Sequence, residues 1–133
     1  MKISELFIKK MKENNGRILI YSLNDKPINI YLDNDNSFRS DKLRNQSINP
    51  EVLDIIINFL KQNHGKANKG NGRDSKVGYD KCYKGTIMYE VATKYYGKLE
   101  GESTFDPLFV LCAILDWLHV ARNCRGYIKM YLK

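Results

Sequence analysis

The sequence predicts an α+β domain in which an N-terminal helix and a β-hairpin pack on a helical core, with two helices and a strand or wing at the C-terminal end. Three observations support this class. Four segments repeat apolar residues at helical spacing. Three shorter segments are rich in β-branched and aromatic residues, which is typical of strands. With 133 residues, the chain suits a single domain spanning 1–133.

The first part of the chain predicts one helix followed by a hairpin. Residues 3–13 place apolar side chains on one face, and Ser4 is the expected N-cap. The runs RILIYSL (17–23) and INIYL (28–32) are separated by the turn sequence NDKP, which favours a β-hairpin. We interpret FRSDKLRN (38–45) as a third, short edge strand.

A second helix is predicted from Asn49 to His64. Asn49 is a favourable N-cap, and Pro50 fits the first helical position. Apolar residues cover more than one stripe of this segment, so we expect the helix to lie centrally in the fold.

The C-terminal half predicts two more helices and a strand. One helix spans 86–96 with Thr86 near its cap, and another begins at Asp106 and ends near His119. Apolar residues alternate with polar or aromatic ones from 127 to 133, as expected for a half-buried strand.

Most of the excess charge lies in one glycine-rich segment. Residues 61–84 hold seven basic and two acidic residues, and so carry +5 of the net charge of +7. They show no hydrophobic periodicity, and we interpret 64–84 as a long loop of the kind that is often functional. Cations separated by Gly, Asn and Ser suit phosphate groups, because glycine lets backbone N–H groups approach an anion and the cations release counterions.

Two helices followed by a basic segment, ARNCRGYIKMYL (121–132), make up the C-terminal third. This order resembles winged-helix DNA-binding domains, in which two packed helices precede a β-hairpin wing with Arg and Gly at its tip. The resemblance covers residues 84–133 and implies that Arg122, Arg125 and Gly126 form such a tip. It also implies that Tyr127 and Lys129 lie on the outward face of the strand. The helix before a wing should present a polar face to the major groove, but helix 106–119 is apolar on most sides. We therefore expect it to be buried on both sides or to contact a second copy or a protein partner.

We predict a non-enzymatic module that binds nucleic acid, with duplex DNA favoured, by gripping the phosphate backbone. The predicted contact residues are Lys66, Lys69, Arg73, Lys76, Tyr79, Lys81, Lys84, Arg122, Arg125 and Lys129. This interface requires the basic loop and the C-terminal hairpin to lie on the same side of the molecule, with Lys69 close to Arg125.

Catalytic and metal-binding functions find little support in the sequence. The three cysteines and two histidines form no zinc-binding pair and no known catalytic motif, so we predict no catalytic residue, metal or cofactor. Asp33 and Asp35 are explained better as turn residues than as metal ligands. Asp41 and Lys42 are the only trace of a nuclease motif, and the second carboxylate is absent there.

The main alternative is a small protein–protein interaction factor, such as a phage-type inhibitor of a host defence enzyme, which would use the apolar surface of helix 106–119. The N-terminus interrupts its apolar run with charges, so we expect neither a signal peptide nor a membrane span. An odd number of cysteines without a CxxC pair indicates a reducing, cytoplasmic setting.

Overall fold

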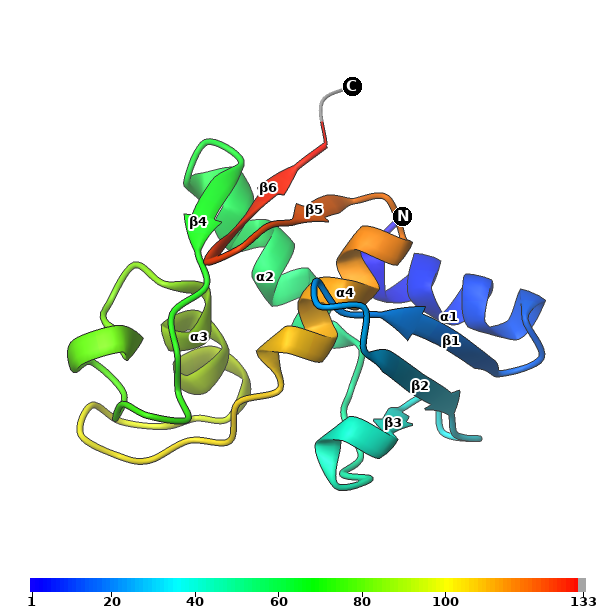
Figure 1. Cartoon of the computed structure of the whole chain (residues 1–133), viewed down its shortest axis with the longest axis horizontal. Helices are drawn as coiled ribbons and strands as arrows, with labels where there is room; N and C mark the ends of the chain where they lie inside the picture. Colours follow the sequence, from blue (N-terminus) through cyan, green and yellow to red (C-terminus); the bar gives the residue numbers. More distant parts are fainter. Residues whose placement is uncertain (132–133) are drawn as a thin grey trace.

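The computed structural model describes residues 1–131 and shows a mixed α+β fold in which two small antiparallel sheets flank a set of helices (Figure 1). This is the predicted class. The helical elements are α1 (Ile3–Glu13), η1 (Asp41–Leu43), α2 (Glu51–Gln62), η2 (Asp80–Cys82), α3 (Ile87–Glu90), η3 (Val91–Tyr95) and α4 (Leu108–Trp117). The strands are β1 (Arg17–Tyr21), β2 (Pro27–Leu32), β3 (Phe38–Ser40), β4 (Lys66–Asn68), β5 (Ala121–Asn123) and β6 (Tyr127–Met130).

Sheet 1 has the order β1–β2–β3 and contains the predicted hairpin. Its central strand buries Ile28 and Ile30 completely. The segment predicted as a third strand, 38–45, gives the short strand β3 and then the 3₁₀ turn η1. Phe38 of β3 meets Phe7 of α1 with ring centroids 5.0 Å apart, so α1 packs against this sheet.

Helix α1 covers the predicted segment, but its predicted cap is wrong. Ser4 lies inside the first turn, and its backbone N–H donates to Asp54 Oδ1 of α2 at 3.0 Å. A carboxylate from a neighbouring helix therefore satisfies a helix N-terminus that local sequence rules assigned to serine.

Helix α3 begins where the sequence predicts, whereas α2 begins one residue later, at Glu51 instead of Pro50. Asn49 Oδ1 accepts from the N–H of Glu51 at 3.0 Å, which caps α2. Thr86 Oγ1 accepts from the N–H of Tyr89 at 3.2 Å, which caps α3. The predicted helix 86–96 continues from α3 into the π-helical segment η3.

Helix α4 is the central element of the core, and it contacts β1 of sheet 1 and β5 of sheet 2. Asp106 Oδ1 accepts from the N–H of Leu108 at 2.9 Å, which agrees with its predicted role at this helix start, although α4 begins at Leu108 instead of Pro107. Every residue from Leu108 to Leu115 is buried except Phe109, which is 40% exposed. Of the two expectations for this helix, burial on both sides is therefore confirmed, and little apolar surface is left for a second copy or another protein.

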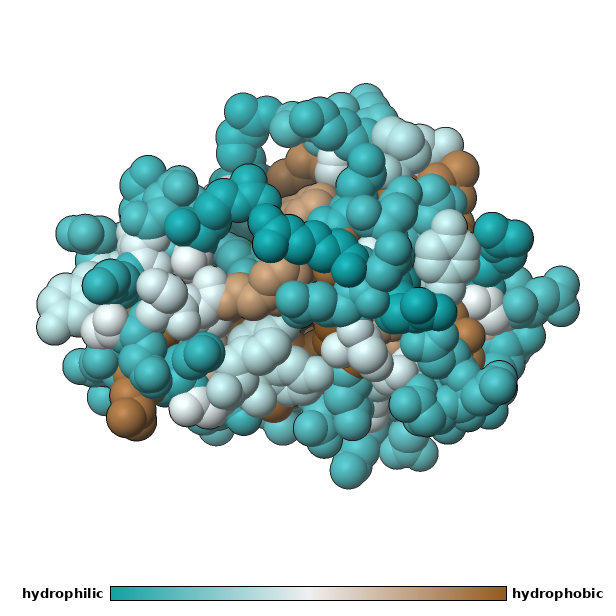
Figure 2. Space-filling model, turned by 90° about the horizontal axis from the view of Figure 1, so that it is seen from below, coloured by the Kyte–Doolittle hydropathy of each residue, from teal (hydrophilic) through white to brown (hydrophobic). Residues whose placement is uncertain are grey.

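Hydrophilic residues dominate the face seen from below in Figure 2, where apolar residues appear in small separate areas. The apolar side chains instead form one continuous cluster that includes both sheets and α4. Among residues 1–131, none of the helices has the length and apolarity that crossing a bilayer requires.

Sheet 2 has the order β4–β6–β5 and corrects the prediction that 64–84 is entirely a loop. Strand β4 has the sequence KAN, which is too short and too polar to show a strand pattern, and only Ala67 points into the core. It is a strand because all three of its residues pair with residues of β6. Strand β6 lies within the predicted strand 127–133 and ends at Met130, and residues 132 and 133 lie outside the described residues.

Candidate functional site

Three cations form a row across sheet 2. Lys129 of the central strand is the direct partner of Lys66 on β4 and of Arg122 on β5. Direct partners in antiparallel strands place their side chains on the same face, so these three lie side by side. All three side chains are exposed. We call Lys66, Arg122 and Lys129 the cationic row.

The register of sheet 2 fixes the face that the row occupies. Ala67 and Ile128, which are one residue away in the strands, are buried in the core. Because side chains alternate along a strand, the row must point away from the core. Lys66 Nζ also lies 4.4 Å from the ring centroid of Tyr127, a cation–π contact on the same outer face.

Among residues 1–131, no carboxylate forms an ion pair with the cationic row. Within residues 1–131 the ion pairs are Arg39–Asp33 and Lys94–Glu90, and neither involves sheet 2. Like charges that lie directly opposite one another in a sheet repel, which costs roughly 0.2–1 kcal/mol for each pair. The row therefore lowers the stability of the isolated fold.

Asp116 is an acid beside sheet 2, but its oxygens are occupied. Asp116 Oδ2 accepts from the N–H of Asn123 at 2.9 Å, and Asp116 Oδ1 accepts from the Tyr131 hydroxyl. This hydrogen bond, followed by burial, raises the pKa of Tyr131, whereas the nearby Arg122 acts in the opposite direction. Asp116 thus ties α4 to sheet 2 and forms no ion pair with the cationic row.

The basic segment and the C-terminal hairpin meet at the end of sheet 2. The N–H of Lys69 donates to the carbonyl of Gly126 at 2.9 Å, which places Lys69 beside the hairpin tip that contains Arg125. Gly126 has a φ of +83°, a left-handed conformation that glycine adopts without strain in such a turn. The two basic stretches that the proposed interface requires on one side are therefore adjacent.

Other predicted contact residues lie further away. Lys76, Tyr79 and Lys81 surround η2, which forms the left end of the molecule in Figure 1, away from β5 and β6. Lys84 follows Tyr83, whose hydroxyl accepts from Asn68 Nδ2 at 3.0 Å, so it stays closer to sheet 2. The ten predicted residues therefore do not form a single patch.

A groove of about 600 Å³ opens beside the hairpin, and two more of the predicted contact residues, Lys69 and Arg73, line it. Its opposite wall contains Lys26 and Lys42, and Phe109 of α4 also lines it. The last three residues were not predicted to contribute to a site. No local pattern distinguishes them, because they meet only through the tertiary packing of four chain segments.

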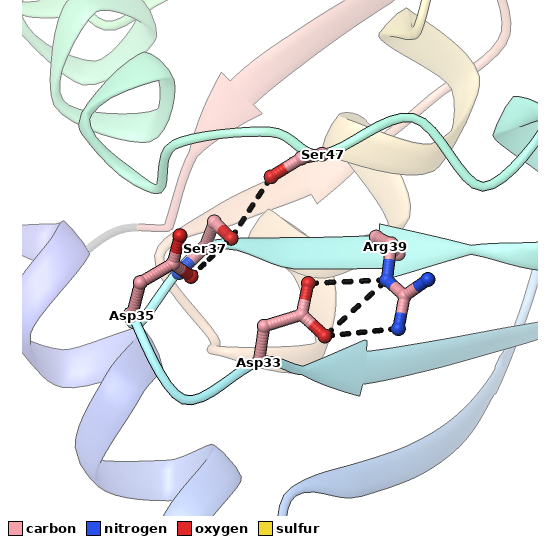
Figure 3. Close-up of polar contacts among 5 residues, drawn as sticks. All are labelled: Asp33, Asp35, Ser37, Arg39 and Ser47. Carbon is pink, nitrogen blue, oxygen red and sulfur yellow. Dashed lines mark hydrogen bonds and ion pairs between the residues drawn. The ribbon is translucent and has the colours of Figure 1, made fainter.

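The acidic turn before β3 is engaged in local contacts (Figure 3). Asp33 pairs with Arg39, with 3.0 Å between Oδ1 and Nη2. Asp35 accepts from the hydroxyl and the N–H of Ser37, and these bonds hold the pKa of its carboxyl below the usual range. Ser47 donates to Ser37 and extends the network. Among residues 1–131 no cluster of three or more His, Cys, Asp or Glu side chains is arranged to hold a metal ion.

Comparisons of the chain with protein-family models, with curated proteins and with solved structures found no match.

Proposed function

We propose that this protein is a non-enzymatic module that binds the phosphate backbone of nucleic acid, with duplex DNA as the favoured form. The observation that supports the proposal most directly is the unpaired cationic row on sheet 2. A like-charged row costs the fold stability, and an anionic ligand that bridges the three side chains removes this cost.

The proposed contact surface consists of the cationic row and Arg125 at the hairpin tip, with Lys69 beside it. The winged-helix resemblance agrees with a grip by this hairpin, and it remains a hypothesis. Helix α4 has no exposed polar face that reaches base edges in a groove. We therefore expect binding to depend on backbone charge and to discriminate poorly between base sequences.

The test is the affinity for a short blunt duplex over a salt series, measured by fluorescence anisotropy. The triple variant Lys66→Gln, Arg122→Gln and Lys129→Gln should lower the affinity on the order of 10- to 100-fold at about 50 mM salt. It should also make the plot of log K against log salt shallower by about 2.7, at about 0.9 for each lost phosphate contact.

A matched triple variant controls for the loss of net charge. Lys2, Lys9 and Lys12 are exposed on or beside α1, and changing all three to Gln removes the same charge without touching sheet 2. This control should keep the affinity within about 2-fold and the slope unchanged. The proposal fails when wild-type protein does not retain duplex DNA at low salt, or when the two triple variants lose the same affinity.

A second candidate is binding to a protein partner, and the exposed edge of sheet 1 favours it. β1 is an edge strand, and its Leu19 and Tyr21 are 52% and 57% exposed. An edge strand can pair with an extended segment of another chain. Absence of DNA binding together with a stable heterocomplex or dimer on a sizing column would favour this candidate over the first.

A further inference from the structure

The groove beside the hairpin has the size and construction of a ligand site. Its volume of about 600 Å³ lies within the range of small-molecule sites. The β1–β2 turn, η1, the segment after β4 and the start of α4 form its walls. Its mouth adjoins the hairpin, because Lys69 lines the groove and is bonded to Gly126 at 2.9 Å.

Four cations from three separate segments meet in this groove. Lys26 comes from the β1–β2 turn, Lys42 from η1, and Lys69 and Arg73 from the segment after β4. Sequence proximity explains only the last two. The convergence of the other two creates a positive groove between the two halves of the fold.

The carboxylates in the groove hold its walls together. Asp106 accepts from the N–H of Gly72 at 2.8 Å and from the N–H of Leu108 at 2.9 Å. Asp74 accepts from Asn71 Nδ2 at 3.1 Å. Asp106 thereby fastens the basic segment to the start of α4, and the groove keeps an excess of two positive charges.

Lys69 is half-buried and lines the groove. Burial raises the pKa of the Cys112 thiol to about 12, and the positive charge of Lys69 partly opposes this effect. A lysine held inside the groove loses less conformational entropy when it meets an anion than a lysine on the open surface does.

Phe109 gives the groove an aromatic surface. It is the exception on an otherwise buried stretch of α4, with 40% of its surface exposed. A single exposed apolar residue is ordinary. An exposed aromatic ring within a groove that also holds four cations matches the way proteins bind unpaired nucleotides, by stacking a base and pairing its phosphate.

We propose that this groove accepts one unstacked nucleotide of a single strand, with its base on Phe109 and its phosphate near Lys69 and Lys42. This proposal rests on the proposed function, because the single strand continues from a duplex held by the cationic row. A base inside a duplex cannot reach Phe109 without leaving its stack. The preferred ligand is therefore a duplex with a single-stranded overhang.

The test compares a blunt duplex with the same duplex carrying a short oligothymidine overhang, using anisotropy at low salt. Wild-type protein should bind the overhang duplex about 5- to 10-fold more tightly, in line with the stacking of one base. Phe109→Leu keeps apolar bulk but removes the ring, so it should reduce this preference to within about 2-fold. The affinity of that variant for the blunt duplex should stay unchanged.

Two further variants make the result specific to the groove. Tyr79→Leu changes an aromatic residue that is 57% exposed near η2, outside the groove, and should keep the preference. Lys42→Gln changes an exposed side chain of the opposite wall and should reduce the preference about 3-fold, with the affinity for the blunt duplex unchanged.

The possible outcomes separate this inference from the proposed function. Equal binding of blunt and overhang duplexes by wild-type protein overturns the groove proposal and leaves the proposed function standing. An equal loss of preference in Phe109→Leu and Tyr79→Leu also overturns it. Absence of binding to either duplex overturns both proposals.

Discussion

The two three-stranded sheets pack on the same central helix, but the cationic side chains of the two sheets make different contacts. In sheet 1, Arg39 is paired with Asp33 at 3.0 Å, and Arg17 lies 5.3 Å from the ring centroid of Tyr31. In sheet 2, Lys129 stands between Lys66 and Arg122, and no carboxylate of the described residues, 1–131, pairs with any of the three.

This difference shows that the fold does not need unpaired charge to build such a sheet. Sheet 1 reaches the same architecture with one of its two arginines paired to a carboxylate and no row of three facing cations, although Arg17, like Lys66 of sheet 2, contacts a tyrosine ring. The repulsion in sheet 2 therefore has no structural benefit, and local violations of stability rules are expected at functional sites. Sheet 2, and not sheet 1, is therefore the sheet that we propose for anion binding.

The two sheets share one hydrophobic core. Substitutions in their central strands test this, and they should cause the largest change in the free energy of unfolding. Ile30 of β2 and Ile128 of β6 are both fully buried. Changing either to Ala should lower the free energy of unfolding by about 2–4 kcal/mol, because each leaves a cavity. Urea denaturation followed by fluorescence and by circular dichroism measures both losses.

With a shared core, each Ile→Ala variant should unfold in one transition that is the same by both probes. A second transition in the Ile128→Ala variant alone would show that sheet 2 is an independent unit. The two sheets could then not be compared as parts of one cooperative structure.

A smaller effect concerns the pH dependence of the core that the sheets share. Burial raises the pKa of Cys112 in α4 to about 12. In the unfolded chain, the same thiol should ionise at about pH 8.5, the pKa of an ordinary cysteine. Below this pH the thiol is protonated in both states and has no effect. Above it, only the unfolded state loses the proton, so stability falls as pH rises, by up to about 1.4 kcal/mol per pH unit.

Urea denaturation between about pH 8 and pH 10 measures this slope. Cys112→Ala should make the fall in stability with pH less steep. Cys82 contributes in the same direction, because burial also raises its pKa, so some slope should persist. An identical slope in wild type and Cys112→Ala would contradict the expectation.

The smallest expected effect concerns the charges themselves. The double variant Arg122→Gln and Lys129→Gln removes two opposed cations and should raise the free energy of unfolding by about 0.2–1 kcal/mol at low salt. Arg39→Gln removes a paired cation from sheet 1 and should lower it by about 0.2–1 kcal/mol. Thermal denaturation at two salt concentrations measures both changes, and added salt should shrink both. If the free energy of unfolding changed in the same direction in both variants, the charges of the two sheets would not differ in their effect on stability.

Much of the fold was predictable because its signals are local. The caps Asn49, Thr86 and Asp106, the hairpin of sheet 1 and the apolar helix α4 all follow from short-range patterns. The exceptions depend on distant contacts. Asp54 caps α1 from another helix, and β4 is a strand only because β6 pairs with it.

The candidate site was predictable in composition but not in arrangement. The excess of cations in two stretches indicated which residues to consider. Which of them face one another depends on the register of β4 and β5 with β6, and three residues of KAN carry no register signal. Neither Lys26 nor Lys42 was predicted to join the basic segment, because each lies in a short polar segment of its own and meets Lys69 and Arg73 only in the folded chain.

The pairing of β4 with β6 has a consequence for the order of folding. Sheet 1 joins near neighbours, such as Arg17 with Tyr31, whereas sheet 2 joins Lys66 with Lys129. Contacts between such distant residues form late, since a large loop must close before they gain any energy. The proposed polyanion-binding surface is therefore expected to assemble only as the chain completes its tertiary structure, so partly folded molecules should lack it.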